Sequence, residues 1–179
     1  MEVRVFSTAP LKFNEGYMTS AVNTTSSARN VILAIAGLII SSKVAVPLFP
    51  VPITLQMFAI YYLGLMLSPR ESFSAVFGWL MLGAAGLPVF ASPVGGLGGP
   101  TAGYLIGMLF GNPLIGVALK HSLSPIGACI ICYAVNHLCG CVWLSGFVGW
   151  DNVLQCGVLP FIIPEFLKIT AAVAIYLKK

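Results

Sequence analysis

The sequence predicts an all-α integral membrane protein, a bundle of six transmembrane helices with both termini in the cytoplasm. Of its 179 residues, 58% are hydrophobic and only 8% are charged, whereas soluble domains carry about 25% charged residues. A domain of this length cannot bury so much apolar surface in a soluble core. The apolar residues also gather into six runs without the two-residue alternation of barrel strands, which favours helices.

The six runs are separated by short breaks rich in proline, glycine or charged residues. Several runs are shorter than the roughly 20 residues that cross about 30 Å of hydrocarbon, so we expect them to include flanking residues. The fourth run contains Asn112 and Pro113, which we interpret as a kink within one helix, because two halves would be too short to span. In chain order the runs are residues 31–46, 53–67, 72–87, 102–119, 123–150 and 153–177.

The basic residues predict the orientation, because cytoplasmic loops carry an excess of Lys and Arg. With both termini inside, the exceptions among the nine basic residues are Lys43 and Lys168. The outer face then receives residues 47–54 and 87–100. We expect residues 1–27 to form a cytoplasmic segment and residues 28–179 to form the membrane domain. The basic residues placed on the cytoplasmic side are Arg4, Lys12, Arg29, Arg70, Lys120, Lys178 and Lys179.

Glu165 and Lys168 are the strongest candidates for a ligand site. They lie three residues apart in an apolar run, so a helix presents them on one face. Ionisable groups inside a membrane usually face a bundle interior or a polar cavity. Pro164 suits the first turn of a helix, which leaves open that Glu165 is an interfacial charge at a helix start and Lys168 its salt partner.

The outer segment 90–104 is the second candidate, since five of its fifteen residues are glycine. Such a segment can wrap a small ligand with main-chain groups, or it can be an ordinary interhelical loop. We expect Thr101 to cap the following helix, and Tyr104 to offer an aromatic face to a flat heterocycle or to a membrane interface. The candidate ligand residues of this segment are Phe90, Ser92, Gly95, Gly96, Thr101 and Tyr104.

Polar side chains inside two further runs complete the candidate ligand residues. Gln56 lies at the start of the second run, as an inward hydrogen-bonding amide or an interfacial residue. Asn136 and His137 lie in the middle of the fifth run. Three roles stay open for them there: hydrogen bonds to other helices, contact with a ligand, or proton relay. Gly37 and Ser41 form a small-residue pattern in the first run, suited to a partner helix or to packing within the bundle.

Five cysteines raise the question of a metal or redox site, which we reject. Cys129 and Cys132 have the spacing of a redox pair, but no helix start or cation lies beside them to activate a thiol. We expect them to pack as small apolar residues, and we expect no metal site. The chain has no glycine-rich phosphate loop that ends in Gly-Lys-Ser or Gly-Lys-Thr, so we do not expect it to hydrolyse ATP itself.

Three motifs in order give the chain a family resemblance. They are FPVPITLQ at residues 49–56, GAAGLPVFA at 83–91 and GPTAGYLIG at 99–107. In these motifs the chain resembles the BioY family, the biotin-binding S components of energy-coupling factor (ECF) transporters. The resemblance implies a multi-pass protein of the bacterial inner membrane, surrounded by lipid, which captures biotin from the outer side.

The same resemblance implies partners and residue roles. The partners are one transmembrane coupling protein and two ATPase subunits, with no nucleic acid, no enzymatic activity and no cofactor besides biotin as the transported ligand. The family's Asp-x-x-Lys pattern falls on Glu165 and Lys168, with Glu in place of Asp. It implies that Glu165 binds the ureido N–H groups of biotin and Lys168 binds an oxygen of the ligand.

Other functions stay open at this stage. The scaffold alone does not choose its ligand, so an S component for another vitamin is the nearest alternative. A small intramembrane enzyme would need clustered ionisable groups, for which His137 and Glu165 are the candidates. A structural membrane subunit would bind no small ligand.

Overall fold

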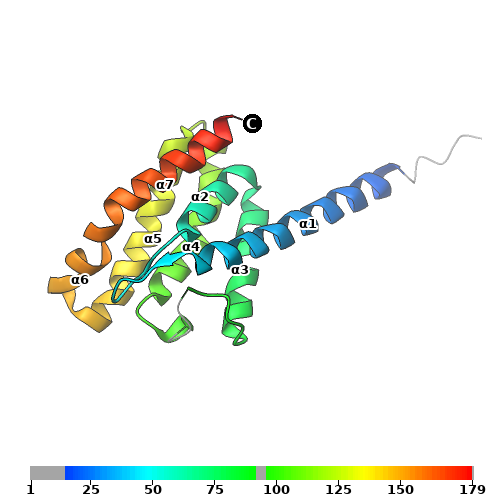
Figure 1. Ribbon diagram of the computed structural model, residues 1–179. Coiled ribbons are helices and arrows are strands. Elements are labelled where there is room, and N and C mark those ends of the chain that lie inside the picture. The colour runs from blue at the N-terminus through cyan, green and yellow to red at the C-terminus, as the bar shows by residue number, and fades with distance from the viewer. Residues whose placement is uncertain (1–14, 92–95, 179) are drawn as a thin grey trace, which may run out of the picture.

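The structure, a computed structural model, describes residues 15–91 and 96–178, with the backbone alone for residues 15–25 and 96. The described chain is mostly helical, which confirms the predicted all-α class (Figure 1). The expected boundary at residue 27 falls within the first helix, and residues 1–14 of the expected N-terminal segment lie outside the described residues. The elements are α1 Glu15–Lys43, β1 Ala45–Val46, β2 Ile53–Thr54, α2 Gln56–Met66, α3 Pro69–Ala84, the 3-10 helix η1 Gly96–Gly98, α4 Ala102–Lys120, α5 Pro125–Val148, α6 Trp150–Gly157 and α7 Leu159–Leu177.

The predicted apolar runs coincide with helices, but the sixth run divides into two. Residues 150–152, expected as a break, begin α6, and Val158 leaves the helical conformation before α7 begins. Pro160 explains the division, because its ring would clash with the carbonyl of the residue four positions earlier if α6 continued. Gly149 separates α5 from α6 with a φ of 76°, a conformation that glycine adopts without strain.

The fourth run forms one helix, α4, as the sequence predicts. Pro113 lies inside it, and the preceding Asn112 side chain is fully buried against α2. Its Nδ2 donates a hydrogen bond of 2.6 Å to the carbonyl oxygen of Ile60. This bond joins the two helices at the level of the proline.

Three helical segments of the described chain are long and apolar enough to cross a membrane. They are α4, α5 and the α6–α7 pair, while α2 is apolar but shorter. Large apolar side chains also cover the outside of the bundle, among them Leu138 at 68% exposed and Ile163 at 73%. Water disfavours so large an apolar surface, whereas lipid tails accommodate it. The chain is a membrane protein.

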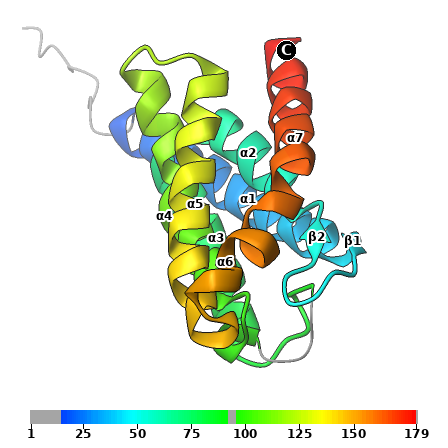
Figure 2. The same cartoon turned by 90° about the vertical axis from the view of Figure 1, so that its left-hand side faces the viewer.

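The connections between helices gather at two opposite ends of the bundle. The β1–β2 hairpin, the segment that follows α3, and α6 lie at one end (Figure 2). The α4–α5 turn and the C-terminus lie at the other end (Figure 1). The two strands pair antiparallel, with Val46 opposite Ile53, and their hairpin was not foreseen in the sequence.

The segment after α3 is held against the end of α1 by buried hydrogen bonds. The indole N–H of Trp79 and the hydroxyl of Ser42 both donate to the carbonyl oxygen of Val89, over 3.1 and 2.8 Å. Nζ of Lys43 donates to the carbonyl oxygen of Phe90 over 2.7 Å. Lys43, an exception in the predicted charge distribution, therefore fixes the backbone at the hairpin end of the bundle.

Glycines on α4 let it approach α5 closely. A Cβ at Gly103 would lie 2.5 Å from the carbonyl oxygen of Cys139, and one at Gly107 would lie 2.7 Å from Cα of Asn136. Small residues at such spacing bring membrane helices together. A Cβ at Gly37 of α1 would meet no atom within 4 Å, so partner docking on that helix stays a prediction.

Candidate functional site

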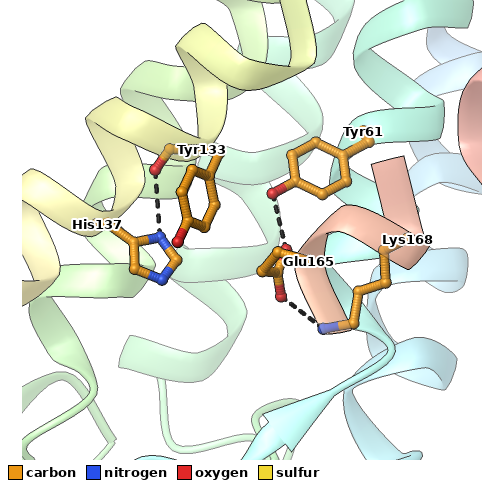
Figure 3. A network of polar contacts seen from close by, with 5 residues as sticks. All are labelled: Tyr61, Tyr133, His137, Glu165 and Lys168. Carbon is orange, nitrogen blue, oxygen red and sulfur yellow. Dashed lines mark hydrogen bonds and ion pairs between the residues drawn. The ribbon is translucent and has the colours of Figure 1, made fainter. Parts of the chain in front are cut away.

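Glu165 and Lys168 form an ion pair on α7, in which Glu165 is buried and Lys168 is partly buried. Nζ of Lys168 lies 2.6 Å from Oε1 of Glu165, and only 2% of Glu165 is exposed (Figure 3). Pro164 lies inside α7, whose first turn contains Pro160 instead. The reading of Glu165 as a charge at a helix start is therefore wrong. A buried carboxylate needs a cation or hydrogen-bond donors.

Tyr61 on α2 is the second partner of this carboxylate. Its hydroxyl donates a hydrogen bond of 2.7 Å to Oε2 of Glu165, so each carboxylate oxygen has its own partner (Figure 3). Tyr61 is fully buried, and sequence reasoning missed it. The available signal was a phenol inside an apolar run, since a buried tyrosine usually needs a hydrogen-bond partner.

A pocket of about 40 Å³ opens beside the ion pair. Residues from the β1–β2 hairpin and from α2, α4, α5 and α7 converge on it, so the pocket depends on the tertiary fold. Its lining combines an apolar wall with a few polar groups, as small-molecule sites do. The lining residues are Val51, Pro52, Thr54, Met57, Tyr104, Met108, Asn136, His137, Phe161, Glu165 and Lys168.

A second pocket of about 50 Å³ adjoins the first. Each pocket is smaller than the roughly 300 Å³ at which ligand pockets begin. The residues that line both pockets come from the hairpin and α4: Val51, Pro52, Thr54, Tyr104 and Met108. The second pocket is also lined by Gln56, Phe90, Ala91, Thr101 and Leu105.

The structure thus brings together seven of the candidate ligand residues. Ser92 and Gly95 lie outside the described residues, and Gly96 begins the short helix η1. Thr101 occupies the N-cap position of α4 but makes no capping hydrogen bond with its side chain, so the capping prediction is wrong. The candidates that line the two pockets are Gln56, Phe90, Thr101, Tyr104, Asn136, Glu165 and Lys168.

Two of the candidate amides also bind neighbouring helices. Nδ2 of Asn136 donates to the carbonyl oxygen of Tyr104 over 2.6 Å, which joins α5 to α4. Nε2 of Gln56 lies 3.2 Å from the sulfur of Met108. The predicted interhelical role of Asn136 is confirmed, and the residue lines the pocket at the same time.

His137 lines the pocket opposite the ion pair. Its Nδ1 lies 3.2 Å from the carbonyl oxygen of Tyr133, one helical turn earlier (Figure 3). The imidazole also packs against the rings of Tyr104 and Phe161, with centroid distances of 5.6 and 5.8 Å. The site therefore presents a carboxylate, an ammonium group and an imidazole to one small space.

The cysteines contribute no ligand set. Cys129 and Cys132 are buried free thiols, and Cys132 packs against Gly111 of α4. Across the part of the chain that the structure describes, no group of three His, Cys, Asp or Glu residues is arranged to hold a metal ion.

Comparison with known proteins places this site in a family context. The family model of the BioY family matches residues 17–179. A probable biotin transporter BioY of Pyrococcus horikoshii is 36% identical over 151 residues, which cover 81% of this chain and 90% of the relative. The biotin transporter BioY of Thermotoga maritima is 32% identical over 158 residues, which cover 80% of this chain and 90% of the relative.

A solved structure is similar over most of the chain. The crystal structure of the S component for biotin from an ECF-type ABC transporter superposes with a TM-score of 0.72. The match has 27% sequence identity and covers 86% of this chain and 90% of the other. Sequence motifs, a family-wide match and a common fold agree, and this chain belongs to the BioY family.

Proposed function

We propose that this protein is the biotin-binding S component of an ECF-type vitamin transporter, and that the pocket beside Glu165 and Lys168 is its biotin site. The ion pair between buried Glu165 and partly buried Lys168 carries the proposal. Separating two charges from water is unfavourable, and polar groups at membrane depth commonly mark ligand pathways. The relatives that are named biotin transporters and the similar biotin S component support the choice of ligand.

The chemistry of biotin suits the groups in the pocket. The ureido ring of biotin has two N–H donors beside one carbonyl acceptor, and its thioether ring and chain are apolar. Glu165 accepts a hydrogen bond from a ureido N–H, and Lys168 donates to an oxygen of the ligand. Tyr61 holds the second oxygen of Glu165 in place. The side chains of Met57, Met108 and Phe161 supply apolar contacts.

Binding requires the hairpin and its neighbours to move. The two pockets of about 40 and 50 Å³ share lining residues, among them Thr54 and Met108. Withdrawal of these side chains would join the pockets into one space for a ligand. We place the hairpin end of the bundle on the outer side of the membrane, where it receives biotin, and the candidate ligand residues Ser92, Gly95 and Gly96 remain part of this proposal.

The membrane arrangement follows from the same proposal. Six helical segments cross the bacterial inner membrane, with both termini in the cytoplasm and α6 and α7 together forming the sixth. Residues 1–27 form a variable cytoplasmic segment. A coupling protein and two ATPase subunits drive the release of biotin into the cell. The protein itself is not an enzyme, because it passes biotin on unchanged and uses no cofactor.

The test is equilibrium binding of radiolabelled biotin to the detergent-purified protein. Glu165→Gln and Lys168→Met should each weaken binding about 10- to 100-fold, since a hydrogen bond to a charged group contributes about 1.5–3 kcal/mol. Matched controls are Glu71→Gln and Lys120→Met, which alter a carboxylate and an ammonium group outside the pocket and should bind as the wild type does.

Competition distinguishes this function from the alternatives. Unlabelled biotin should displace the label, whereas thiamine, riboflavin or folate at the same concentration should not. Displacement of the label by another vitamin with higher affinity than biotin would reassign the ligand. Absence of any biotin binding by folded wild-type protein would refute the proposal.

A further inference from the structure

One ring nitrogen of His137 has no partner in the described part of the chain. The residue is 8% exposed, and its Nε2 is a buried atom without a hydrogen bond. Buried polar atoms are almost always paired in native structures, by protein or by another molecule. Because His137 lines the pocket of Glu165 and Lys168, a bound ligand can supply the missing partner.

The other ring nitrogen indicates which kind of partner Nε2 needs. Nδ1 lies 3.2 Å from the carbonyl oxygen of Tyr133, and a carbonyl oxygen only accepts hydrogen bonds. In this contact Nδ1 carries the proton and donates it. The neutral imidazole then has a lone pair on Nε2, so Nε2 accepts a hydrogen bond from an N–H or O–H donor.

The aromatic neighbours keep the imidazole in this orientation. The ring of Tyr133 lies 4.0 Å from it between centroids, and Tyr104 and Phe161 contact it edge to face. A ring flip would break the contact of Nδ1 with the carbonyl oxygen of Tyr133. The acceptor is therefore presented to the pocket by packing as well as by a hydrogen bond.

We propose that Nε2 of His137 accepts a hydrogen bond from one N–H of a cyclic urea, while Glu165 accepts from the other N–H. This inference rests on the proposed biotin site. Lys168 then donates to the urea carbonyl. The protein thus offers two acceptors, His137 and Glu165, to the two N–H groups of the urea, and one donor, Lys168, to its carbonyl oxygen. His137 and Glu165 lie on different helices, α5 and α7, on either side of this space (Figure 3).

The pairing makes His137 a specificity residue. A ligand with a single ring N–H would leave either Nε2 or the carboxylate unpaired in a buried site, and sites with unpaired polar groups discriminate strongly against such analogues. The protein should therefore prefer biotin over analogues in which either ureido nitrogen is methylated. Loss of the acceptor at residue 137 should remove part of that preference.

The first experiment measures binding of biotin and of its two mono-N-methyl ureido analogues to the wild type and three variants. His137→Phe keeps an aromatic ring without the acceptor, and should weaken biotin binding about tenfold. His137→Gln places a carbonyl oxygen near the position of Nε2 and should recover part of the affinity. The other histidine of the chain, His121, is exposed in the turn after α4, and His121→Phe is the matched control.

Coupling between ligand and residue is the decisive measurement. For one of the two analogues, the loss of affinity caused by the methyl group should be about tenfold smaller in His137→Phe than in the wild type. Equal methyl effects in both proteins, or unchanged biotin affinity in His137→Phe, would overturn the inference while leaving biotin binding intact. A wild type that binds no biotin would end both the proposed function and this inference.

A second experiment does not depend on substituting the pocket. In the ¹⁵N-histidine-labelled His121→Phe protein, His137 is the remaining histidine. Long-range ¹H–¹⁵N spectra should show the proton on Nδ1, and biotin should shift the Nε2 resonance as expected for an accepted hydrogen bond. A proton on Nε2 in the free protein, or an Nε2 resonance unaffected by bound biotin, would contradict the inference.

Discussion

The hydroxyl of Tyr61 on α2 donates a 2.7 Å hydrogen bond to the carboxylate of Glu165 on α7, across 104 positions of the sequence. Both side chains are buried, and the other carboxylate oxygen is held by Lys168. The two partners therefore hold the carboxylate in place, and Glu165 lines the pocket. In this arrangement Tyr61 positions Glu165 without lining the pocket itself.

Replacement of Tyr61 by phenylalanine should loosen this arrangement. Tyr61→Phe removes one donor from a buried charged acceptor, which should lower the free energy of unfolding by about 1.5–3 kcal/mol and weaken biotin binding several-fold. Thermal unfolding and biotin binding in detergent measure the two effects. Tyr62→Phe, at the adjacent position on α2, is the control and should change neither. Wild-type binding and stability in Tyr61→Phe would show that the hydrogen bond does not position the carboxylate.

The ion pair itself should show strong coupling in a double-mutant cycle. Removal of one partner strands the other charge in a buried site, which commonly lowers stability by about 3–5 kcal/mol. Glu165→Gln and Lys168→Met should each approach that loss, whereas the double variant should be less destabilised than the sum of the two. Unfolding of the four proteins, measured side by side in one detergent, gives the coupling energy. Additive losses would mean that the two charges stabilise the fold independently.

A second carboxylate, Glu71, predicts a pH dependence at the other end of the bundle. Glu71 lies in the first turn of α3, before the apolar part of that helix. Ser68 and Glu71 cap the helix through reciprocal hydrogen bonds. The hydroxyl of Ser68 donates to Glu71 over 2.7 Å, and this bond is the main reason that the pKa of Glu71 is lowered. Loss of the cap in Ser68→Ala should destabilise the protein by about 1 kcal/mol.

The sign of the pH effect follows from the direction of that shift. A carboxylate with a lowered pKa in the folded state stabilises the protein above its unfolded pKa of about 4.3, and the contribution is lost as the pH falls through the folded pKa. The unfolding temperature of the wild type should therefore fall more steeply than that of Glu71→Gln as the pH is lowered from 6 to 3. Parallel curves for the two proteins would exclude a role for ionised Glu71 in the cap.

The sequence predicts the helices and the ion pair for reasons that are local. Apolar runs determine where helices form in a membrane, and two charges inside such a run are conspicuous wherever they lie, as Glu165 and Lys168 do. Lys43 and Lys168, the two exceptions in the charge distribution, each have a specific partner in the structure. The two lysines that depart from the predicted cytoplasmic excess of basic residues are thus residues with structural roles.

The parts that sequence reasoning missed depend on contacts between distant segments. Tyr61 resembles any tyrosine of an apolar helix until α7 is placed beside α2. The pocket combines five elements, so residues such as Phe161 and Met57 gain a role through packing that no local pattern shows. The division of the sixth run into α6 and α7 was not predicted, because the run is apolar on both sides of Val158 and only Pro160 marks the start of the second helix.

The close α4–α5 contact predicts that a single methyl group on α4 can disturb the site by displacing α5. A Cβ at Gly107 would lie 2.7 Å from Cα of Asn136 and 2.8 Å from its carbonyl oxygen, and both atoms are backbone and cannot turn away. Gly107→Ala should therefore push α5 outward, lower stability by about 1–3 kcal/mol and shift Asn136 and His137 at the pocket, with weaker biotin binding.

Gly146→Ala is the matched control for this change. Gly146 also lies within α5, but a Cβ there would meet no atom within 4 Å. The substitution should be neutral or slightly stabilising, because alanine favours a helix over glycine by about 1 kcal/mol. Thermal unfolding and biotin binding of both variants measure the difference. If Gly107→Ala were as stable as Gly146→Ala and bound biotin normally, the two helices would not need the close approach that places the polar residues of α5 at the pocket.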